Sequence, residues 1–498
     1  MKRQDFDLKD LFNCKKLSQS FHEKRFNRLL PNKDLQTEDR KKSIKTTKND
    51  FFYKLWYHPE SRIIILLILS RLVFLIFTHW GMDFDFYIEI AQRVLAGEKL
   101  YTDIESTHMP LADLFYISMY FICPWKNNII ALRLFMKFPY LLTDVGISLA
   151  VMKIIENEKR KTDYNNQFLD DVAFEKVRKT KMRAGYFVVF SLPLILQTGG
   201  GRYDSLLILC FTMTILCMQK NNFFGVTFYA ALGSSAKYIG IIFLPFVIIW
   251  LKREDFLPFA LGLILGFIPI YPFLITIPNE FIDAILLRDS HIAYGFSIWH
   301  AILIIWSGFK IKFVGGISDT YASQDEPWFI QRLYLPMFVI IYLTIFILYI
   351  IRYRKQFKEK NINDLPLQIL ISLVFIPLFI FSLSFKAINI QVLAWFTPFF
   401  ALRNKKSLLI EYSILTIVNG LALLFYEASI NPSIFLEMSQ LAATQDSIFY
   451  LLIVNPAMRI TQVLPSVIWV AIMLGTILWF YTRTSVEFIS SSKELLKE

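Results

Sequence analysis

Two aspartates, Asp83 and Asp85, stand two positions apart in the segment GMDFDFYIEI, directly after the first long apolar segment of the chain. A carboxylate at a bilayer surface is desolvated on one side, which raises its pKa and suits it to work as a general base. The two side chains share one face only if the segment is extended. On a helix they would point about 200° apart, and one would be structural. A solvated acidic turn is the alternative explanation of this pair.

Other ionisable and polar residues interrupt apolar segments or stand at their ends. Arg71 and Asp144 lie inside such segments. The residues near segment ends are Arg202, Asp204, Lys237, Lys386 and Gln391. An ionisable group at membrane depth is costly unless it is paired or faces a cavity, so these residues are functional candidates. Cations beside an acidic base are what a phosphate-bearing substrate requires. Internal ion pairs, such as Arg202 with Asp144 or Asp204, are the alternative.

Two aromatic residues are weaker candidates. His108 could donate a hydrogen bond to a substrate, and Trp395 could stack on a sugar or an isoprenoid. A satisfied loop histidine and a membrane-interface tryptophan are the simpler explanations. The four cysteines and six histidines show no metal-ligand spacing, so no metal site or disulfide framework is predicted. No basic and aromatic pattern indicates nucleic-acid binding.

The elements that must position these residues are long apolar segments. Hydrophobic residues make up 55% of the 498 residues, charged residues only 19%, and the mean hydropathy is +0.44. Soluble domains are roughly a quarter charged, and an α-helix needs about 20 apolar residues to cross a bilayer. The composition excludes an ordinary soluble enzyme and a disordered chain. We predict an all-α polytopic membrane protein with about twelve transmembrane helices. The expected spans are 62–80, 131–155, 184–199, 203–219, 222–236, 238–251, 256–276, 333–351, 366–384, 390–403, 407–426 and 464–482.

The distribution of Lys and Arg sets the expected topology. Residues 1–60 form a basic tail without the apolar core of a signal peptide. With this tail inside, the Lys/Arg-dense connections between spans all fall on the cytoplasmic side, as the positive-inside rule requires. The transmembrane domain is expected over 61–485, and 486–498 form a second cytoplasmic tail. The charged candidates near segment ends then lie at the outer boundary, on the same side as the aspartate pair.

Two large loops are expected on the extracytoplasmic side. The segments 81–130 and 277–332 are each about fifty residues long and contain amphipathic stretches. A helix with one apolar and one polar face lies along a membrane interface rather than crossing it. We therefore expect the chemistry of this protein on its outer face, beneath these loops.

The order of these motifs resembles that of the GT-C superfamily, the glycosyltransferases that use polyprenyl-phosphate sugars. Within it, the nearest likeness is to the mannosyltransferases that add the first mannose of glycosylphosphatidylinositol and to their prokaryotic relatives. The residues that carry the resemblance are Asp83-Phe84-Asp85, Gly97 with Tyr101, Pro110-Leu111, Asp144, Leu192-Pro193 with Gly201 and Asp204-Ser205, Lys237, and Phe385-Lys386 with Gln391 and Trp395. The match covers roughly residues 70–405. The chain departs from the family's pattern at His108-Met109, Tyr203 and Val392. These departures bear on the identity of the acceptor and of the donor more than on the fold.

The resemblance implies an inverting sugar transfer from a lipid phosphate, with little or no dependence on a metal and no cofactor. Asp83 would be the general base and Asp85 would orient the acceptor or sugar, although the two roles can be exchanged. Lys237 and Arg202 would hold the donor phosphate. The remaining substrate contacts would come from Asp204, Tyr101, His108, Lys386, Gln391 and Trp395, with Arg71 and Asp144 in supporting positions. The partners would be a polyprenyl- or dolichyl-phosphate sugar, a lipid-linked or glycan acceptor, and membrane lipid.

Two other functions stay open at this point. A multi-pass transporter or lipid flippase would explain the helices and buried charges, but no two matching halves are visible. An O-antigen-type polymerase or ligase would rely on a late outer loop, where Arg288 and His291 stand. The Lys-, Ile-, Phe- and Asn-rich usage indicates an AT-rich genome, which favours a prokaryotic plasma membrane over the endoplasmic reticulum. The sugar and the acceptor are not determined by the sequence.

Overall fold

The computed structural model describes residues 58–403 and residue 410, except 78–80, 105, 107, 165–170, 287–293, 296–298, 300, 301, 303–326, 355, 386 and 389–390. The predicted spans 407–426 and 464–482, nearly all of the basic tail, the C-terminal tail, and Arg288 and His291 lie outside the described residues. Packing contacts divide the chain into Met1–His58 and Pro59–Glu498, and every element below belongs to the second unit.

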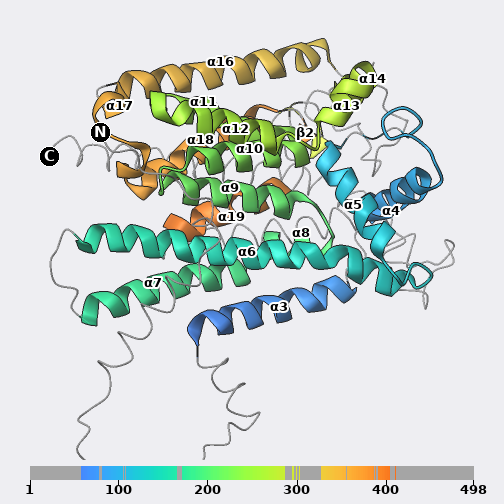
Figure 1. Ribbon diagram of the computed structural model, residues 1–498, viewed down its shortest axis with the longest axis horizontal. Helices are drawn as coiled ribbons and strands as arrows, with labels where there is room; N and C mark the ends of the chain where they lie inside the picture. The colour runs from blue at the N-terminus through green and yellow to red at the C-terminus, as the bar shows by residue number, and fades with distance from the viewer. Residues whose placement is uncertain are drawn as a thin grey trace, which may run out of the picture. The chain divides into compact units, whose positions relative to one another are not determined.

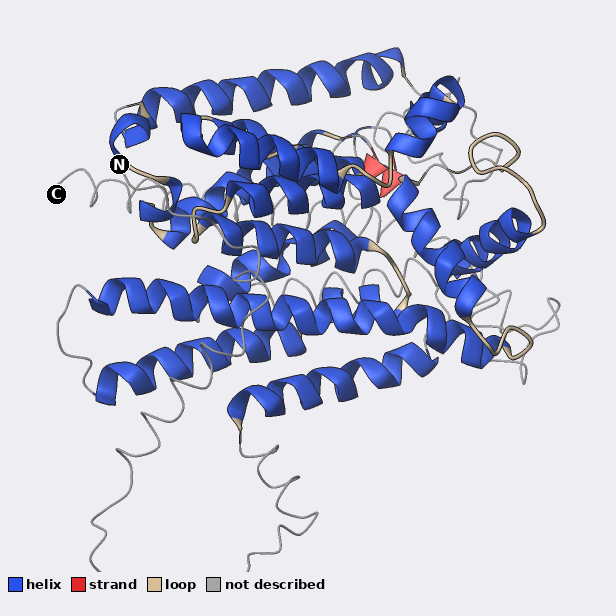
Figure 2. Cartoon of the chain, in the orientation of Figure 1, coloured by secondary structure: helices blue, strands red, loops and turns tan. Residues whose placement is uncertain are grey.

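Helices make up almost all of the regular structure, and the predicted all-α class is confirmed in the described residues (Figure 2). The β-strands described are two residues long, β1 (Tyr294–Gly295) and β2 (Ala387–Ile388), and they pair in parallel. The longer helices are α3 (Pro59–Phe77), α4 (Gly81–Leu95), α5 (Pro110–Ile122), α6 (Ile129–Tyr164), α7 (Asp171–Val189), α9 (Asp204–Met218), α10 (Phe223–Ala236), α12 (Phe256–Gly266), α16 (Trp328–Tyr353), α18 (Leu367–Ser384) and α19 (Gln391–Arg403). The shorter ones are α8 (Leu192–Gly199), η3 (Tyr238–Ile241), α11 (Leu244–Ile248), η4 (Arg253–Asp255), α13 (Tyr271–Thr276), α14 (Pro278–Leu286), α17 (Gln356–Glu359) and η7 (Ile362–Asp364).

Two of the helices have the length and hydropathy of a membrane span. They are α6, over Ile129–Lys161, and α16, over Trp328–Tyr353. Few side chains of α16 are buried: Ile340 and Ile351, for example, are 65% and 66% exposed. A long apolar helix that turns its side chains outward is suited to a lipid environment. The described residues thus contain two candidate membrane spans, and the count of about twelve stays a prediction.

Three predicted spans are broken where single helices were expected. The segment 184–199 divides into α7 and α8, 238–251 into η3 and α11, and 256–276 into α12 and α13. Prolines stand close to each break: Pro193, Pro245, Pro269 and Pro272. A proline has no N–H and cannot bond the carbonyl four residues before it, which favours a break at that point.

The connections between the helices lie at two ends of this unit (Figure 1). At one end, which we call the loop end, lie α4, α5, α13, α14 and the strand pair. Aromatic contacts join its two loops, because Tyr101 packs edge-on against Phe273 and Phe281. Residues 86–95, an amphipathic stretch of the first predicted loop, lie in α4, while most of the second predicted loop, 277–332, is not described.

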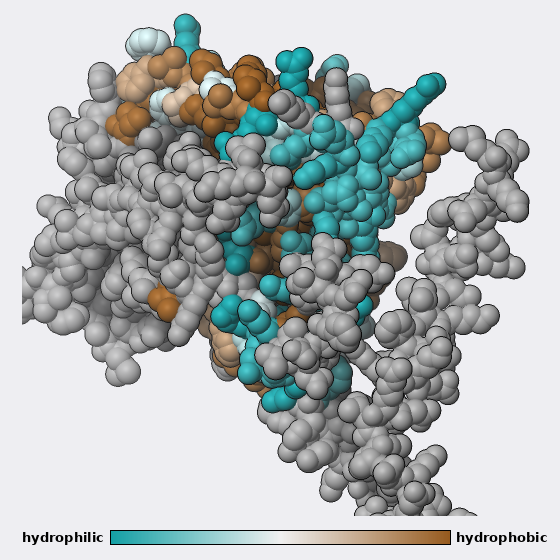
Figure 3. All heavy atoms as spheres, turned by 90° about the vertical axis from the view of Figure 1, so that its left-hand side faces the viewer, coloured by the Kyte–Doolittle hydropathy of each residue, from teal (hydrophilic) through white to brown (hydrophobic). Residues whose placement is uncertain are grey.

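The opposite end, which we call the basic end, carries the end of α6, the start of α7, and α17. Its charged side chains form ion pairs, such as Lys181 with Glu156 and Glu60. Glu158 of α6 accepts a hydrogen bond from the Leu367 amide at the start of α18, at 3.1 Å. Figure 3 looks onto this end, where hydrophilic residues gather beneath the hydrophobic residues at the top. The main apolar core lies between the two ends, among α3, α6, α7, α9, α10, α18 and α19.

Candidate functional site

Lys237 and Trp395, from distant parts of the sequence, both contact Asp204. Lys237 Nζ lies 2.9 Å from Asp204 Oδ1, and Trp395 Nε1 donates to the same oxygen at 2.8 Å. The ammonium also stands 4.8 Å from the centre of the Trp395 ring and 5.6 Å from that of Tyr203, within reach of a cation–π interaction. We call Asp204, Lys237 and Trp395 the lysine centre. All three are buried, so this charge pair is held in a place of low water content.

The local backbone accounts for the position of each member. Asp204 is the first residue of α9, where the helix dipole stabilises a negative charge. Lys237 has an extended backbone (φ −155°, ψ 122°) between α10 and η3. The chain folds back sharply after it, because a Cβ at Gly240 would stand 2.2 Å from the Ser234 nitrogen. Trp395 lies in the second turn of α19.

A layer of tyrosines joins the lysine centre to α4 and α5, in the segment 81–130. Tyr87 of α4 stacks on Tyr116 of α5, with ring centres 3.9 Å apart and planes at 9°. The Tyr116 hydroxyl donates to the Gly201 carbonyl, in the turn that leads into α9. Tyr203 stands edge-on to Tyr87 and at 5.6 Å from the Lys237 ammonium. These contacts fix the first loop against the turn before Asp204.

A second polar cluster lies in the loop before α5. The carboxylate of Asp113 accepts hydrogen bonds from Ser106 Oγ at 2.7 Å and from the Tyr101 hydroxyl at 3.3 Å. Its other oxygen is 3.6 Å from His108 Nδ1, and His108 Nε2 is 3.2 Å from the Tyr87 hydroxyl. Asp113 is fully buried, and burial raises its pKa to about 7, although the bonds from Ser106 and Tyr101 oppose this rise. Asp113 can therefore gain or lose a proton near neutral pH.

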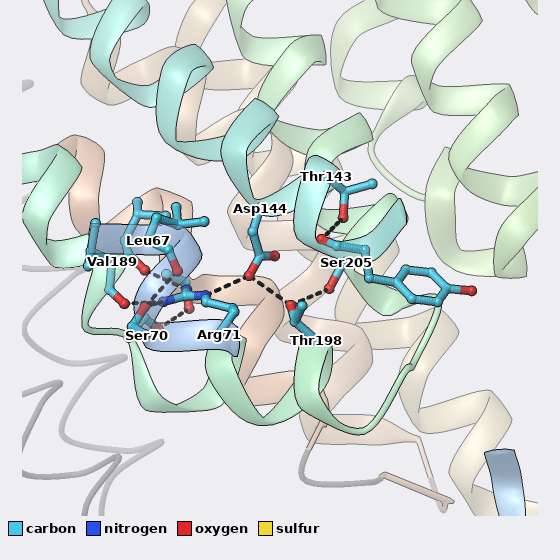
Figure 4. Close-up of polar contacts among 12 residues, drawn as sticks. Leu67, Ser70, Arg71, Thr143, Asp144, Val189, Thr198 and Ser205 are labelled. Carbon is cyan, nitrogen blue, oxygen red and sulfur yellow. Dashed lines mark hydrogen bonds and ion pairs between the residues drawn. The ribbon is translucent and has the colours of Figure 1, made fainter. Parts of the chain in front are cut away.

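Arg71 and Asp144 form a separate network in the core (Figure 4). Arg71 Nε donates to Asp144 Oδ2 at 2.9 Å, and Thr198 donates to the same oxygen at 2.7 Å. The rest of the guanidinium donates to the carbonyls of Val188 and Val189 at the end of α7. The carbonyl of Val189 has no amide donor four residues on, because that residue is a proline. This network ties α3, α6 and α8 to the end of α7 and has a structural role.

The structure pairs Asp144 with Arg71 and Asp204 with Lys237. An internal pairing of Arg202, considered above with Asp144 or Asp204, stays a prediction. Arg202 is half-buried in the turn before α9, and its backbone amide donates to the Gln197 carbonyl at 3.0 Å.

The aspartate pair lies on a helix rather than on an extended segment. Residues 83 and 85 both belong to α4, so the two positions are about 200° apart around the helix axis. Asp85 is half exposed and pairs with Arg133 of α6, at 3.0 Å between Oδ1 and Nη2. The side chain of Asp83 is not among those described. A shared face for the two carboxylates is excluded by this geometry.

The other predicted residues are placed only in part. Tyr101 is buried, and its hydroxyl also donates to the His108 carbonyl at 2.7 Å, so it braces the loop. Gln391 begins α19, but its side chain is not described, and Lys386 lies outside the described residues. The described part of the chain contains no group of three or more His, Cys, Asp or Glu that could hold a metal.

Several residues of this region escaped the sequence analysis. Asp113 meets the criterion that selected Asp144, an acidic residue inside an apolar run, and could have been found in the same way. Tyr203 was noted only as a departure from a motif. Tyr87 and Tyr116 carry no signal in the sequence, since they are two of 23 tyrosines and stand in no motif.

No protein-family model matches this chain, and no curated protein is significantly similar to it. The resemblance to the GT-C superfamily therefore stays a prediction from the order of the motifs.

Proposed function

We propose that this protein is a membrane glycosyltransferase of the GT-C type. It would move a sugar, with mannose as the first candidate, from a polyprenyl or dolichyl phosphate to a lipid-linked or glycan acceptor on the extracytoplasmic face. The observation that carries the proposal is the convergence of Asp204, Lys237 and Trp395 from three distant segments, next to the segment 81–130. A transporter would need its binding residues near the bilayer midplane, between two related halves.

The lysine centre has the groups that a phosphate leaving group needs. A lysine ammonium has three N–H donors, and the bond to Asp204 fixes the direction of one of them in Lys237. A cation in a site of low dielectric stabilises the charge that develops on a departing phosphate far better than it would in water. The rings of Tyr203 and Trp395 flank the ammonium, and such rings suit the apolar faces of a sugar or an isoprenoid.

The base would come from α4. Asp85 is held by Arg133, which suits an orienting role, so we assign the removal of the acceptor proton to Asp83. The same helix carries Tyr87, whose contacts with His108 and Tyr203 connect it to the lysine centre. No metal is required in this scheme, because Lys237 and Arg202 supply the positive charge.

The proposed topology has about twelve spans, with both chain ends in the cytoplasm of a prokaryotic cell. Its support is the separation of the Lys/Arg-rich basic end from the loop end. Single cysteines offer a test: a membrane-impermeant maleimide applied to intact cells should label Glu98→Cys at the loop end. It should label Lys179→Cys at the basic end only after permeabilisation. The reverse pattern would refute the orientation.

Sugar transfer is tested with membranes from cells that express the chain, with radiolabelled polyprenyl-phosphate mannose as the donor and the membrane's own lipids as acceptors. Lys237→Met should lower kcat/KM at least about a hundredfold. Lys179→Met is the matched control, because Lys179 is exposed at the basic end, and it should retain full activity. Asp83→Ala should be inactive. Full activity in Asp83→Ala would refute the base assignment, and solute uptake without any transfer would favour a transporter.

A further inference from the structure

We propose that Asp113 is a positioning residue that keeps His108 in its charged, protonated form beside Tyr203, where the imidazolium adds a second positive charge to the one at Lys237. This inference rests on the proposed glycosyl transfer, because the second charge would act on the donor phosphate. Neither residue has this role in the function proposed above, and the resemblance implies only a substrate contact for His108.

The geometry around Asp113 supports a fixed direction for the histidine. Ser106 Oγ donates to Asp113 Oδ2 and accepts the backbone amide of His108 at 3.2 Å, so the loop closes around the carboxylate. The second oxygen, Oδ1, is buried and has no hydrogen-bond partner among the described residues. It is 3.6 Å from His108 Nδ1. A proton on Nδ1 thus faces this carboxylate oxygen and the Ser106 hydroxyl, which is 3.4 Å from Nδ1, and the nearby negative charge favours it.

The other side of the histidine faces the lysine centre. Its Nε2 lies 3.2 Å from the Tyr87 hydroxyl, and its ring stands edge-on to Tyr203 at 5.7 Å between centres. Tyr203 in turn lies 5.6 Å from the Lys237 ammonium. The imidazole is therefore separated from the lysine by about one aromatic ring, and a positive charge on it would be felt there because the intervening groups are apolar.

The titratable groups around the pair are mostly tyrosines, and the charged ones are the lysines and Asp204, which pairs with Lys237. The loop supplies Tyr101, and α13 and α14 supply only Phe273 and Phe281 behind it. The titratable groups of the neighbouring elements at this end include Tyr87 of α4, Tyr116 of α5, Tyr140 and Lys137 of α6, Tyr203 before α9, Asp204 at the start of α9, and Lys237 after α10. Glu98 and Asp103 of the loop are turned toward Arg93 and the Lys99 amide. A nearby carboxylate favours the imidazolium over the neutral ring, and Asp113 is the carboxylate in contact.

Asp113→Asn separates this role from a structural one, because an asparagine resembles the protonated carboxyl group. At pH 5.5 the variant and the wild type should have donor KM values within about twofold of each other. At pH 8 the variant should lose the imidazolium, and its donor KM should rise about tenfold with kcat little changed, the effect of about one pKa unit. Glu89→Gln, an exposed change on α4, is the control and should match the wild type at both pH values. An equal loss at both pH values would show a structural role and overturn the proposal.

A second measurement does not depend on sugar transfer. Diethyl pyrocarbonate reacts with the neutral imidazole, and peptide mass spectrometry reports the extent of reaction at His108 alone. The pH at which His108 reaches half of its maximal reaction rate should lie about one unit lower in Asp113→Asn than in the wild type. Coincident pH–rate profiles would refute the proposal even if transfer occurs. The expected rates without any transfer would instead count against the proposed function. If Asp113→Asn does not fold, His108→Gln should show the raised donor KM without a pH dependence, and a wild-type KM in that variant would refute the role.

Discussion

Replacing Arg71 by methionine tests the interpretation of the core network most directly. Arg71 is fully buried, and its guanidinium bonds Asp144 at 2.9 Å, the Val188 carbonyl at 2.9 Å and the Val189 carbonyl. A methionine fills a similar apolar volume but donates nothing. The Asp144 carboxylate would then keep hydroxyl donors only, such as Thr198, and the end of α7 would lose its cationic cap.

The expected cost follows from the burial of both partners. Removing one member of a buried, hydrogen-bonded ion pair destabilises proteins by about 3–5 kcal/mol, because the other charge is left without compensation. That range corresponds to a change of about a hundredfold to a few thousandfold in the unfolding equilibrium. Arg71→Met combined with Asp144→Leu removes both charges and should recover part of this loss. The recovery should be incomplete, because the Val188 and Val189 carbonyls still lack their donor.

The assay is unfolding of the purified protein in mixed micelles as the fraction of sodium dodecyl sulfate rises, followed by circular dichroism. Arg93→Met is the matched control, since Arg93 forms an exposed ion pair with Glu98 at 2.6 Å, and its unfolding curve should coincide with that of the wild type. A loss below about 1 kcal/mol in Arg71→Met, or strictly additive effects of the two changes, would refute the reasoning.

Three further predictions concern the loop end. Trp395→Phe keeps a ring but removes the donor to Asp204, so it should cost about 1–3 kcal/mol in the same unfolding assay; Trp125→Phe, at an exposed tryptophan, should cost nothing. Burial raises the pKa of Asp113 to about 7, so the folded protein binds this proton more tightly than the unfolded chain. The stability of the wild type relative to Asp113→Asn should fall as the pH rises from about 4 through 7, by about 3 kcal/mol in total, and a pH-independent difference would contradict this. Tyr101→Phe removes a hydrogen bond that lowers the pKa of Asp113, so it should move that stability profile to higher pH.

The sequence predicted the helices well where apolar segments end at polar residues. The expected span 222–236 is α10 at 223–236, and 366–384 is α18 at 367–384. α6 continues to Tyr164, well past its expected end at 155, because Lys and Glu favour a helix once it leaves the apolar layer. Segment length alone could not reveal the breaks after α7, η3 and α12.

The candidate residues were easier to find than their partners. A charge inside an apolar run is visible in any sequence and indicates that a partner exists. Spacing says nothing about which of several distant cations that partner is, since Asp144 pairs with Arg71 across 73 positions. The relation between Asp83 and Asp85 depended on whether the segment was helical or extended, and α4 decides that it is helical.

Prolines alone do not explain where the helices break. Pro139, Pro336, Pro377 and Pro398 all lie inside continuous helices, α6, α16, α18 and α19. What distinguishes the break at Pro193 is a donor that takes the place of the missing amide, and that donor is Arg71.

The break after α7 has a consequence for the lysine centre. It allows the short helix α8 to bring Thr198 to Asp144 and to lead into the turn at Gly201, whose φ of 65° suits a glycine. That turn delivers Asp204 to the start of α9, beside Lys237. The buried Arg71–Asp144 pair therefore supports the lysine centre without contacting it. It follows that Arg71→Met should impair sugar transfer through the position of Asp204, whereas Lys237→Met removes a member of the lysine centre itself.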